Sequence, residues 1–252
     1  MCFDLDSSPP IPVIAGAAVS HEDLVLEAAD GNELAAFVAH PEEASSTGIV
    51  VLPDVRGLYR FYEELALRFA ERGYAAAAFD YFGRSAGVGK RVQDWDYMAH
   101  VRETRQEHIQ ADVAAAVDWL RSHEGGSCRA VFTVGFCFGG RNSWLAAASG
   151  HGLAGAVGFY GNPGPRDGVP GATARAAEIA APILALQAGA DANITPEQNA
   201  AFDEALTAAG VEHELVTYPG APHSFFDRKF DEFAEASEDA WSRVLAFVDR
   251  YA

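Results

Sequence analysis

The chain has 252 residues, and 49% of them are hydrophobic, which is enough to bury the core of an α/β domain. Its 36 acidic and 18 basic residues give a formal net charge of −18, which argues against nucleic acid or an anionic membrane as a partner. An anionic substrate would therefore need a local cluster of basic residues.

The first residues lack the basic and apolar segments of a signal peptide, and no apolar run approaches the ~18 residues of a membrane-spanning helix. Three cysteines without a C-x-x-C spacing do not suggest a disulfide framework, so a reducing cytoplasm is the expected compartment. Residues 1–20 are rich in proline and small residues and are expected to form an extended arm on the surface. Residues 21–252 are then expected to form a single domain.

Strand and helix patterns alternate along this domain. Two apolar runs around Asp30-Gly31-Asn32 predict a hairpin. Apolar runs predict further strands at 48–52, 74–79, 130–134, 153–160, 183–187 and 214–218. Helical patterns lie at 62–70, 109–120, 143–148, from 195 onward and at 241–248, and a loop of about ten residues is expected after Arg84. The alternation predicts a mostly parallel sheet with helices on both faces, with ligands at the carboxyl ends of the strands.

The most informative motif is Gly135-Phe136-Cys137-Phe138-Gly139-Gly140, between a predicted strand and a predicted helix. A nucleophile in a tight glycine-flanked turn between strand and helix is the nucleophile elbow of the α/β-hydrolase fold. The glycines allow strand and helix to approach closely, and the positive end of the helix favours the reactive thiolate. The alternative is that Cys137 is an inert cysteine in a glycine-rich turn.

A nucleophile of this kind needs a histidine base and an acid that orients it, and in this fold the acid and then the histidine follow the nucleophile. Cys137, Asp191 and His223 occur in that order, each at a predicted strand end. Of the eight histidines, only His223 follows the last strand in a turn. Asp191 could instead close a turn, but Thr195 already caps the next helix, so the triad acid is the favoured role.

The fold also predicts two backbone donors for an oxyanion. One is the N–H of the residue after the nucleophile, Phe138, and the other comes from the loop after the third strand, where Val55 is the natural candidate. Attack by Cys137 on an ester or lactone carbonyl would then give a thioester that water hydrolyses.

From about residue 20 onward the chain resembles the dienelactone hydrolase (carboxymethylenebutenolidase) family. The motifs that carry the resemblance are the elbow at 135–140, Gly189-Ala190-Asp191, His223-Ser224-Phe225, Asp80-Tyr81-Phe82-Gly83-Arg84 and Gly158-Phe159-Tyr160-Gly161. The resemblance implies a Cys–His–Asp triad. It also implies that Arg84 binds a carboxylate of the substrate and that Tyr160 lies beside the site.

Two positions depart from the family pattern. Where the family has a glutamate that takes part in activating the thiol, this chain has Asp54, which is one methylene shorter. Where the family has a second arginine for the carboxylate, this chain has Asp227, with Arg228 one residue later. These changes leave the triad intact and open the question of the substrate.

The resemblance implies a hydrolase of a small-molecule lactone or ester, most simply one that converts dienelactone to maleylacetate. One alternative is a thiol esterase or lactonase with a different substrate that need not carry a carboxylate, and another is a non-catalytic binding protein of the same fold. Cys137, Asp191 and His223 argue against the latter. No nucleotide-binding loop or zinc motif occurs, so no metal or cofactor is expected.

Overall fold

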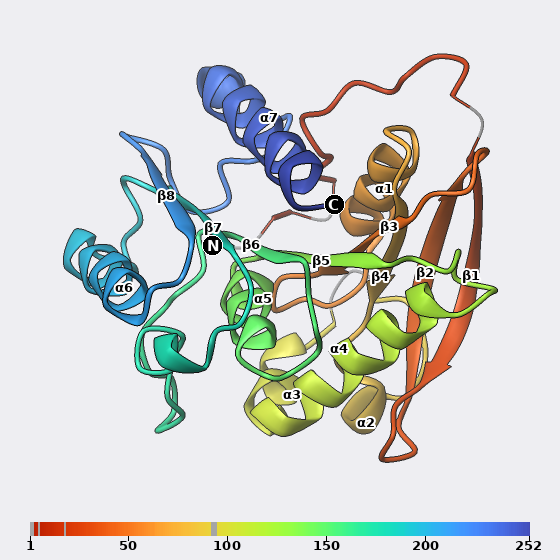
Figure 1. Cartoon of the computed structure of the whole chain (residues 1–252), viewed down its shortest axis with the longest axis horizontal. Helices are drawn as coiled ribbons and strands as arrows, with labels where there is room; N and C mark the ends of the chain where they lie inside the picture. The colour runs from red at the N-terminus through yellow and green to blue at the C-terminus, as the bar shows by residue number, and fades with distance from the viewer. Residues whose placement is uncertain (1–2, 5, 18, 92–94) are drawn as a thin grey trace.

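The computed structural model describes residues 3–4, 6–17, 19–91 and 95–252 (Figure 1). Within these residues the chain forms an eight-stranded sheet of order β1-β2-β4-β3-β5-β6-β7-β8. The strands are β1 (Val19–Glu27), β2 (Glu33–Pro41), β3 (Thr47–Leu52), β4 (Ala75–Phe79), β5 (Ala130–Phe136), β6 (Gly155–Phe159), β7 (Ile183–Ala188) and β8 (His213–Tyr218). β2 pairs antiparallel with β1 and with β4, and the other neighbours are parallel.

Helices cover both faces of the sheet. They are α1 (Arg60–Ala70), α2 (Gly83–Ala86), α3 (Tyr97–Glu103), α4 (Gln106–Arg121), α5 (Phe138–Ala147), α6 (Pro196–Ala209) and α7 (Ala234–Tyr251), with short 3-10 turns η1 (Ala176–Glu178) and η2 (Asp231–Phe233). Figure 1 shows α1 and α7 on one face and α4 and α5 on the other. Each face has its own hydrophobic cluster, so the predicted mostly parallel sheet between helical layers is confirmed. No helix in the described ranges is long and apolar enough to cross a membrane.

The sequence explains which strands are central. Every residue of β3, β4 and β7 is buried, as their uninterrupted apolar runs predict. The edge strand β1 is mostly exposed and polar. The start of α6 is fixed by the predicted capping box, because the Gln198 N–H donates to Thr195 Oγ1 at 3.3 Å and the Thr195 N–H donates to Gln198 Oε1 at 2.9 Å. The segment after Arg84 differs from the expected loop, because it contains the short helices α2 and α3.

The predicted amino-terminal arm is tied into the domain. Residues 1–2, 5 and 18 of the arm lie outside the described residues, and β1 begins at Val19. The expectation that the arm lies on the surface is wrong for Phe3, which is only 2% exposed and stacks on Phe61 with ring centroids 3.9 Å apart. Ile11 is also 2% exposed. Isolated apolar residues among prolines give no periodic signal, so the sequence did not reveal that they would be buried.

We expect Phe3→Ala to destabilise the protein by up to about 3–5 kcal/mol, since it removes a fully packed aromatic ring. Urea denaturation of the full chain measures the change. Val13→Ala is the matched control, because Val13 lies on the same arm with 62% of its surface exposed. Its midpoint should stay close to that of the parent, and equal midpoints for all three proteins would show that the buried ring contributes nothing.

Candidate active site

Cys137 occupies the junction between β5 and α5. Its backbone angles are φ 55° and ψ −110°, in a region that residues other than glycine rarely adopt and that costs about 1–3 kcal/mol. Its N–H donates to the carbonyl of Phe159 on β6 at 3.0 Å, which holds the strained residue in place. The side chain is half-buried at the amino end of α5, where the helix presents N–H groups and partial positive charge.

The glycines of the motif are required by backbone contacts. A Cβ atom on Gly135 would lie 2.0 Å from the Gly139 carbonyl oxygen. A Cβ atom on Gly139 would lie 2.0 Å from the Leu52 carbonyl oxygen, and one on Gly140 would lie 2.7 Å from that of Phe159. All these oxygens belong to the backbone and cannot turn aside. The first turn of α5 therefore rests directly on the ends of three strands, as close approach at an elbow requires.

Asp191 follows β7 and His223 follows β8, and their side chains meet. His223 Nδ1 lies 2.5 Å from Asp191 Oδ2, and the Asp191 side chain is fully buried. The other oxygen of Asp191, Oδ1, accepts the N–H of Asn193 at 2.8 Å and that of Ile194 at 3.3 Å. One oxygen of Asp191 therefore closes the turn while the other contacts the histidine.

Hydrogen bonding keeps Asp191 ionised. Burial by itself would raise the pKa of Asp191, but the hydrogen bond with His223 and those from the Asn193 and Ile194 N–H groups together hold the pKa below its ordinary value. A carboxyl whose pKa is lower in the folded than in the unfolded chain stabilises the fold above its unfolded pKa of about 4. This contribution is lost as the pH falls through the folded pKa.

Tyr160 connects the two halves of the site. It follows β6 with a φ of 36°, is completely buried, and its ring centroid lies 4.9 Å from that of His223. The preceding residue, Phe159, accepts the hydrogen bond from the Cys137 backbone. Cys137 and His223 therefore both contact residues at the end of β6, Cys137 through Phe159 and His223 through Tyr160.

The residues expected to supply oxyanion donors lie at the same edge of the sheet. β3 and β5 are parallel neighbours, and Leu52 lies opposite Gly135. Val55 and Phe138 each lie three positions beyond this pair in the sequence. Val55, Cys137 and Phe138 all contact the same hydrophobic cluster. In the described part of the chain, no backbone carbonyl accepts a hydrogen bond from the N–H of Val55 or Phe138.

Asp54 is engaged by its own loop. Its side chain is buried, with the residue only 1% exposed, and Oδ1 accepts the Arg56 N–H at 2.8 Å while Oδ2 accepts the Tyr59 hydroxyl at 3.1 Å. Burial raises the pKa of Asp54, and these two hydrogen bonds oppose the rise. The bond to Arg56 closes a turn around Val55, and the Gly57 N–H closes it further by donating to the Asp54 carbonyl at 3.1 Å.

Tyr81 is a neighbour of the site that the sequence analysis named only as part of a motif. It is buried, and its hydroxyl donates to the Pro53 carbonyl at 2.9 Å, which supports the loop after β3. Burial raises the pKa of Tyr81 well above its ordinary value, and the ionised forms of the neighbouring Asp54, Asp80 and Cys137 would raise it further. Cys137 and Asp54 therefore both lie within electrostatic reach of this hydroxyl.

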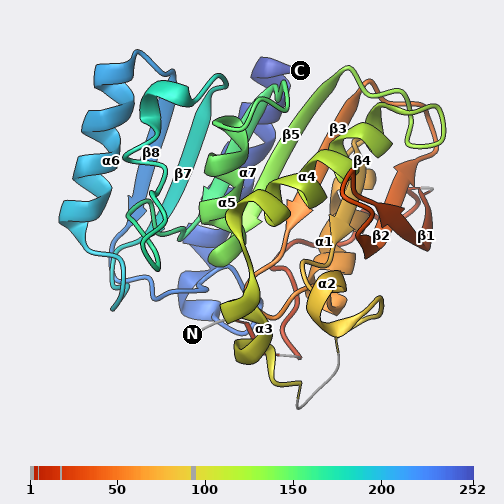
Figure 2. The same cartoon turned by 90° about the horizontal axis from the view of Figure 1, so that it is seen from below.

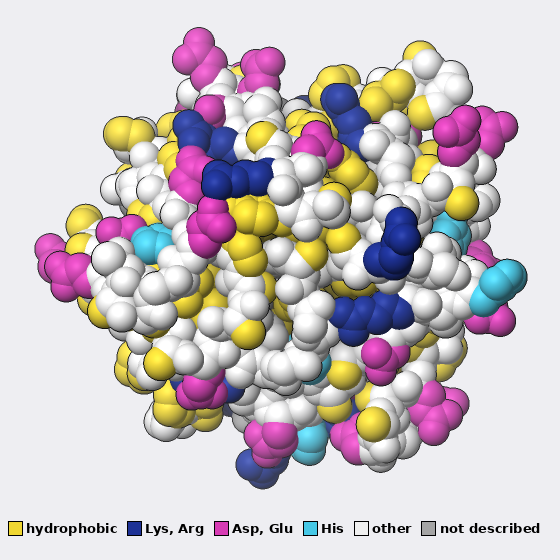
Figure 3. Space-filling model, viewed as in Figure 1, with side chains coloured by type: hydrophobic (Ala, Val, Ile, Leu, Met, Phe, Trp, Pro, Cys, Tyr) yellow, Lys and Arg dark blue, Asp and Glu magenta, His cyan; other side chains and the backbone are white. Residues whose placement is uncertain are grey.

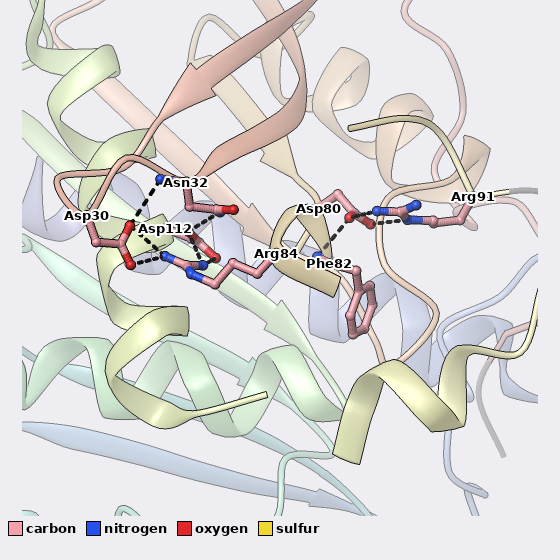
Figure 4. A network of polar contacts seen from close by, with 7 residues as sticks. All are labelled: Asp30, Asn32, Asp80, Phe82, Arg84, Arg91 and Asp112. Carbon is pink, nitrogen blue, oxygen red and sulfur yellow. Dashed lines mark hydrogen bonds and ion pairs between the residues drawn. The ribbon is translucent and has the colours of Figure 1, made fainter. Parts of the chain in front are cut away.

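Arg84 is held by two carboxylates (Figure 4). Its Nη1 contacts both oxygens of Asp112 at 2.7 and 2.6 Å, and its Nη2 contacts both oxygens of Asp30 at 2.8 and 2.6 Å. Asp112 is a buried residue of α4 whose Oδ1 also accepts a hydrogen bond from Asn32 at 3.0 Å. Burial raises the pKa of Asp112 to about 6 despite the hydrogen bonds from Arg84. Figure 4 shows the guanidinium pointing toward these acids, so its charge is already used within the fold.

The altered position at Asp227 serves the amino-terminal arm. Asp227 is 3% exposed, and its Oδ1 accepts the Ser8 N–H at 3.4 Å and the Lys229 N–H at 3.2 Å. Arg228 Nη2 donates to the Pro9 carbonyl at 3.2 Å. Both side chains therefore attach the amino-terminal arm to the domain, and the arm contacts the buried Asp227 carboxylate.

Comparisons with known proteins agree with this architecture. The sequence profile of the dienelactone hydrolase family matches residues 34–252. The chain is 29% identical over 233 residues to a Yersinia pestis protein named "Putative carboxymethylenebutenolidase", with 88% of this chain and 85% of the relative covered. It is 28% identical over 268 residues to the carboxymethylenebutenolidase of Rhodococcus opacus, with 100% of this chain and 97% of the relative covered.

A solved structure extends the likeness to three dimensions. The "Putative Dienelactone Hydrolase from Klebsiella pneumoniae" superposes with a TM-score of 0.81 at 29% identity, covering 93% of this chain and 100% of the other. The predicted α/β-hydrolase fold is thereby confirmed, and the alternative of a non-catalytic binding protein is not supported, because the relatives carry the names of hydrolases. The chain belongs to the dienelactone hydrolase family and is a carboxylic ester hydrolase.

Proposed function

We propose that Cys137 is the nucleophile of an esterase or lactonase that works through a thioester, with His223 as the base and Asp191 as the residue that orients it. The 2.5 Å contact between His223 and Asp191 beside the strained Cys137 turn is the observation that carries this proposal. Because Nδ1 of His223 is engaged by Asp191, Nε2 is the nitrogen that can exchange a proton with the thiol.

The first half of the reaction forms the thioester. His223 takes the proton of Cys137, and Sγ attacks the carbonyl carbon so that a C–S bond forms and the carbonyl oxygen becomes an oxyanion. The N–H groups of Val55 and Phe138 stabilise this oxyanion, an interaction commonly worth a few kcal/mol per donor. When the oxyanion collapses, the C–O bond of the ester breaks and His223 gives its proton to the leaving oxygen.

The second half consumes one water molecule. His223 takes a proton from water, the hydroxide attacks the thioester carbon, and the C–S bond breaks as the thiol of Cys137 is restored. With an open ester the products are an acid and an alcohol. With a lactone the leaving oxygen stays attached, so a single ring-opened acid is released. For dienelactone this product would be maleylacetate, which is the reaction that the family resemblance implies.

The identity of the substrate is a separate question. Hydrolysis of dienelactone remains the first candidate because a relative from Rhodococcus opacus bears the name carboxymethylenebutenolidase. A different lactone or ester is the second candidate, and the double ion pair of Arg84 favours it. If Arg84 is committed to Asp30 and Asp112, then a carboxylate of the substrate must be held by other residues or be absent.

Replacement of the nucleophile tests the mechanism. We expect Cys137→Ala to lower kcat for a chromogenic ester by about 10⁴-fold or more, because the thioester can no longer form. Cys128→Ala is the matched control and should retain activity, since Cys128 is buried and lies before β5. A Cys137→Ala variant that is as fast as the parent would refute the proposed function.

Alkylation tests the reactivity of the thiol independently of any substrate. Iodoacetamide near neutral pH should label Cys137, and peptide mapping should show Cys128 unlabelled, because burial raises the pKa of Cys128 to about 11. Labelling of Cys128 in preference to Cys137 would contradict an activated thiol at the elbow.

We propose that Asp54 is a positioning residue that fixes the turn carrying the Val55 N–H. Direct activation of the Cys137 thiol is the alternative that the family resemblance implied. Asp54→Asn should lower kcat by about 10- to 100-fold, in the range expected for a misplaced oxyanion donor. If Asp54 acts through the turn, the pH dependence of Cys137 alkylation should match that of the parent. A shifted alkylation profile would instead assign Asp54 to the thiol.

Variants can also distinguish a role of Arg84 in the fold from a role in substrate binding. Arg84→Gln leaves Asp112 buried without its cation, so we expect a loss of about 3–5 kcal/mol in the free energy of unfolding, measured in urea. Adding Asp112→Asn should restore part of this loss, because the buried charge is then removed. In the double variant, an increase in KM confined to carboxylate-bearing esters would assign Arg84 to the substrate. Equal KM changes for anionic and neutral esters would assign it to the fold.

A further inference from the structure

A cavity of about 450 Å³ lies beside the elbow and is rich in arginine. Its walls come from the end of α3, the start of α4, α5 and the loop after β6, and its charged members are Arg102, Arg105, Glu107, Arg141, Arg166 and Asp167. Figure 2 shows α2 and α3 at the end of the molecule toward which the parallel strands point. Four arginines against two acids form a local excess of positive charge in a chain that carries 36 acidic and 18 basic residues.

Two of these arginines carry charge that the fold does not use. Within the described ranges, no carboxylate forms an ion pair with Arg102 or Arg105, although most other arginines of the chain are paired with acids. Both residues are exposed at the rim of the cavity. Arg166 forms an ion pair with the exposed Asp167 at 3.3 Å. The guanidinium groups of Arg102 and Arg105 can therefore bind an anion through paired N–H donors.

Arg141 adds a fixed charge behind them. It is only 4% exposed, and it donates to backbone carbonyls, namely those of Asn162, Gly164, Val169 and Pro170. Burial and the neighbouring Arg166 lower the pKa of Arg141 to about 10, so it stays protonated at neutral pH. Buried charges are normally paired with an opposite charge. The described hydrogen bonds of Arg141 go to backbone carbonyls, and none of them goes to a carboxylate.

Gln106 gives an independent sign of a missing acceptor. It is the first residue of α4 and lines the same cavity. Its side-chain nitrogen, Nε2, is buried, and none of the described residues accepts a hydrogen bond from it. A buried donor without an acceptor is costly, typically by about 1–3 kcal/mol. An oxygen-rich anion in the cavity would satisfy it.

The cavity shares a wall with the elbow. Arg166 lies over the ring of Phe138 at 4.9 Å from its centroid, and Phe138 is the residue after Cys137. A ligand group held in the cavity is therefore close to the first turn of α5, whose N–H groups face the reacting carbonyl in the proposed function. The volume of the cavity, about 450 Å³, falls within the range of small-molecule sites.

We propose that this arginine cavity, defined by Arg102, Arg105, Arg141 and Arg166, is a subsite that binds a carboxylate or phosphate group of the substrate. The proposal rests on the proposed function, because it places the anionic group next to the carbonyl that Cys137 attacks. Figure 3 shows both acidic and basic side chains on the viewed face, many of the acidic ones near its outline, whereas the whole chain has a formal net charge of −18.

The test compares matched esters in two double variants. Arg102→Gln/Arg105→Gln removes two positive charges from the subsite, and Arg72→Gln/Arg129→Gln removes two from exposed positions elsewhere. The substrates are 4-nitrophenyl butyrate, which is neutral, and 4-nitrophenyl hemisuccinate, which carries a carboxylate. The ratio of kcat/KM for the anionic over the neutral ester should fall at least about tenfold in the subsite variant and stay at the parental value in the control. An unchanged ratio in the subsite variant would overturn the proposal.

A binding measurement separates this proposal from the proposed function. Titration calorimetry of the Cys137→Ala protein with succinate and with inorganic phosphate measures the subsite without catalysis. Binding of either anion that is lost on adding Arg102→Gln/Arg105→Gln supports the subsite, and the anion that binds more tightly identifies the preferred group. Absence of binding for both anions, or binding unaffected by these substitutions, would refute it even if Cys137 proves to be the nucleophile.

Discussion

The backbone contact between Gly139 and the Leu52 carbonyl is the constraint on which the site depends. It allows the amino end of α5 to rest on the end of β3 and on Pro53, which follows it. The same approach forces Cys137 into a backbone conformation with φ 55°. All residues of α5 are buried, so the packing of this helix offsets a strain of about 1–3 kcal/mol at Cys137, the residue before it.

The Asp191 and Asp54 carboxylates each accept hydrogen bonds at both oxygens. Asp191 uses one oxygen for His223 and the other for its own turn. Asp54 uses one oxygen for the Arg56 N–H and the other for the Tyr59 hydroxyl. A side chain held at both oxygens has little freedom to rotate, so the groups that it positions are ordered before a substrate arrives. Such preorganised polar groups stabilise developing charge without a further cost of reorganisation.

Local patterns were enough to predict the features that depend on neighbouring residues in the chain. The buried strands, the capping box at Thr195 and the glycines around Cys137 are of this kind, because each follows from spacing over a few positions. The partners of Arg84 lie 28 and 54 positions away, and nothing in its own segment indicates them. The burial of Phe3 and the contact of Asp227 with the arm likewise depend on residues brought together only by the fold. The sequence does not indicate the arginine cavity for the same reason, since its residues come from three separate segments.

The use of arginine shows why overall charge is a poor guide to what this protein binds. Many arginines are paired with acids, as Arg91 is with the buried Asp80 at 2.5 Å, and such pairs contribute little field at a distance. The positive charges beside Phe138 are compensated far less, so their field persists inside the cavity. Surface charges are screened over roughly 8–10 Å at physiological salt, whereas partly buried charges are screened less. An anion would therefore be repelled weakly by the acidic exterior and attracted more strongly by the arginines of the cavity. Binding of an anion would then depend on the charges in the cavity and not on the net charge of the protein.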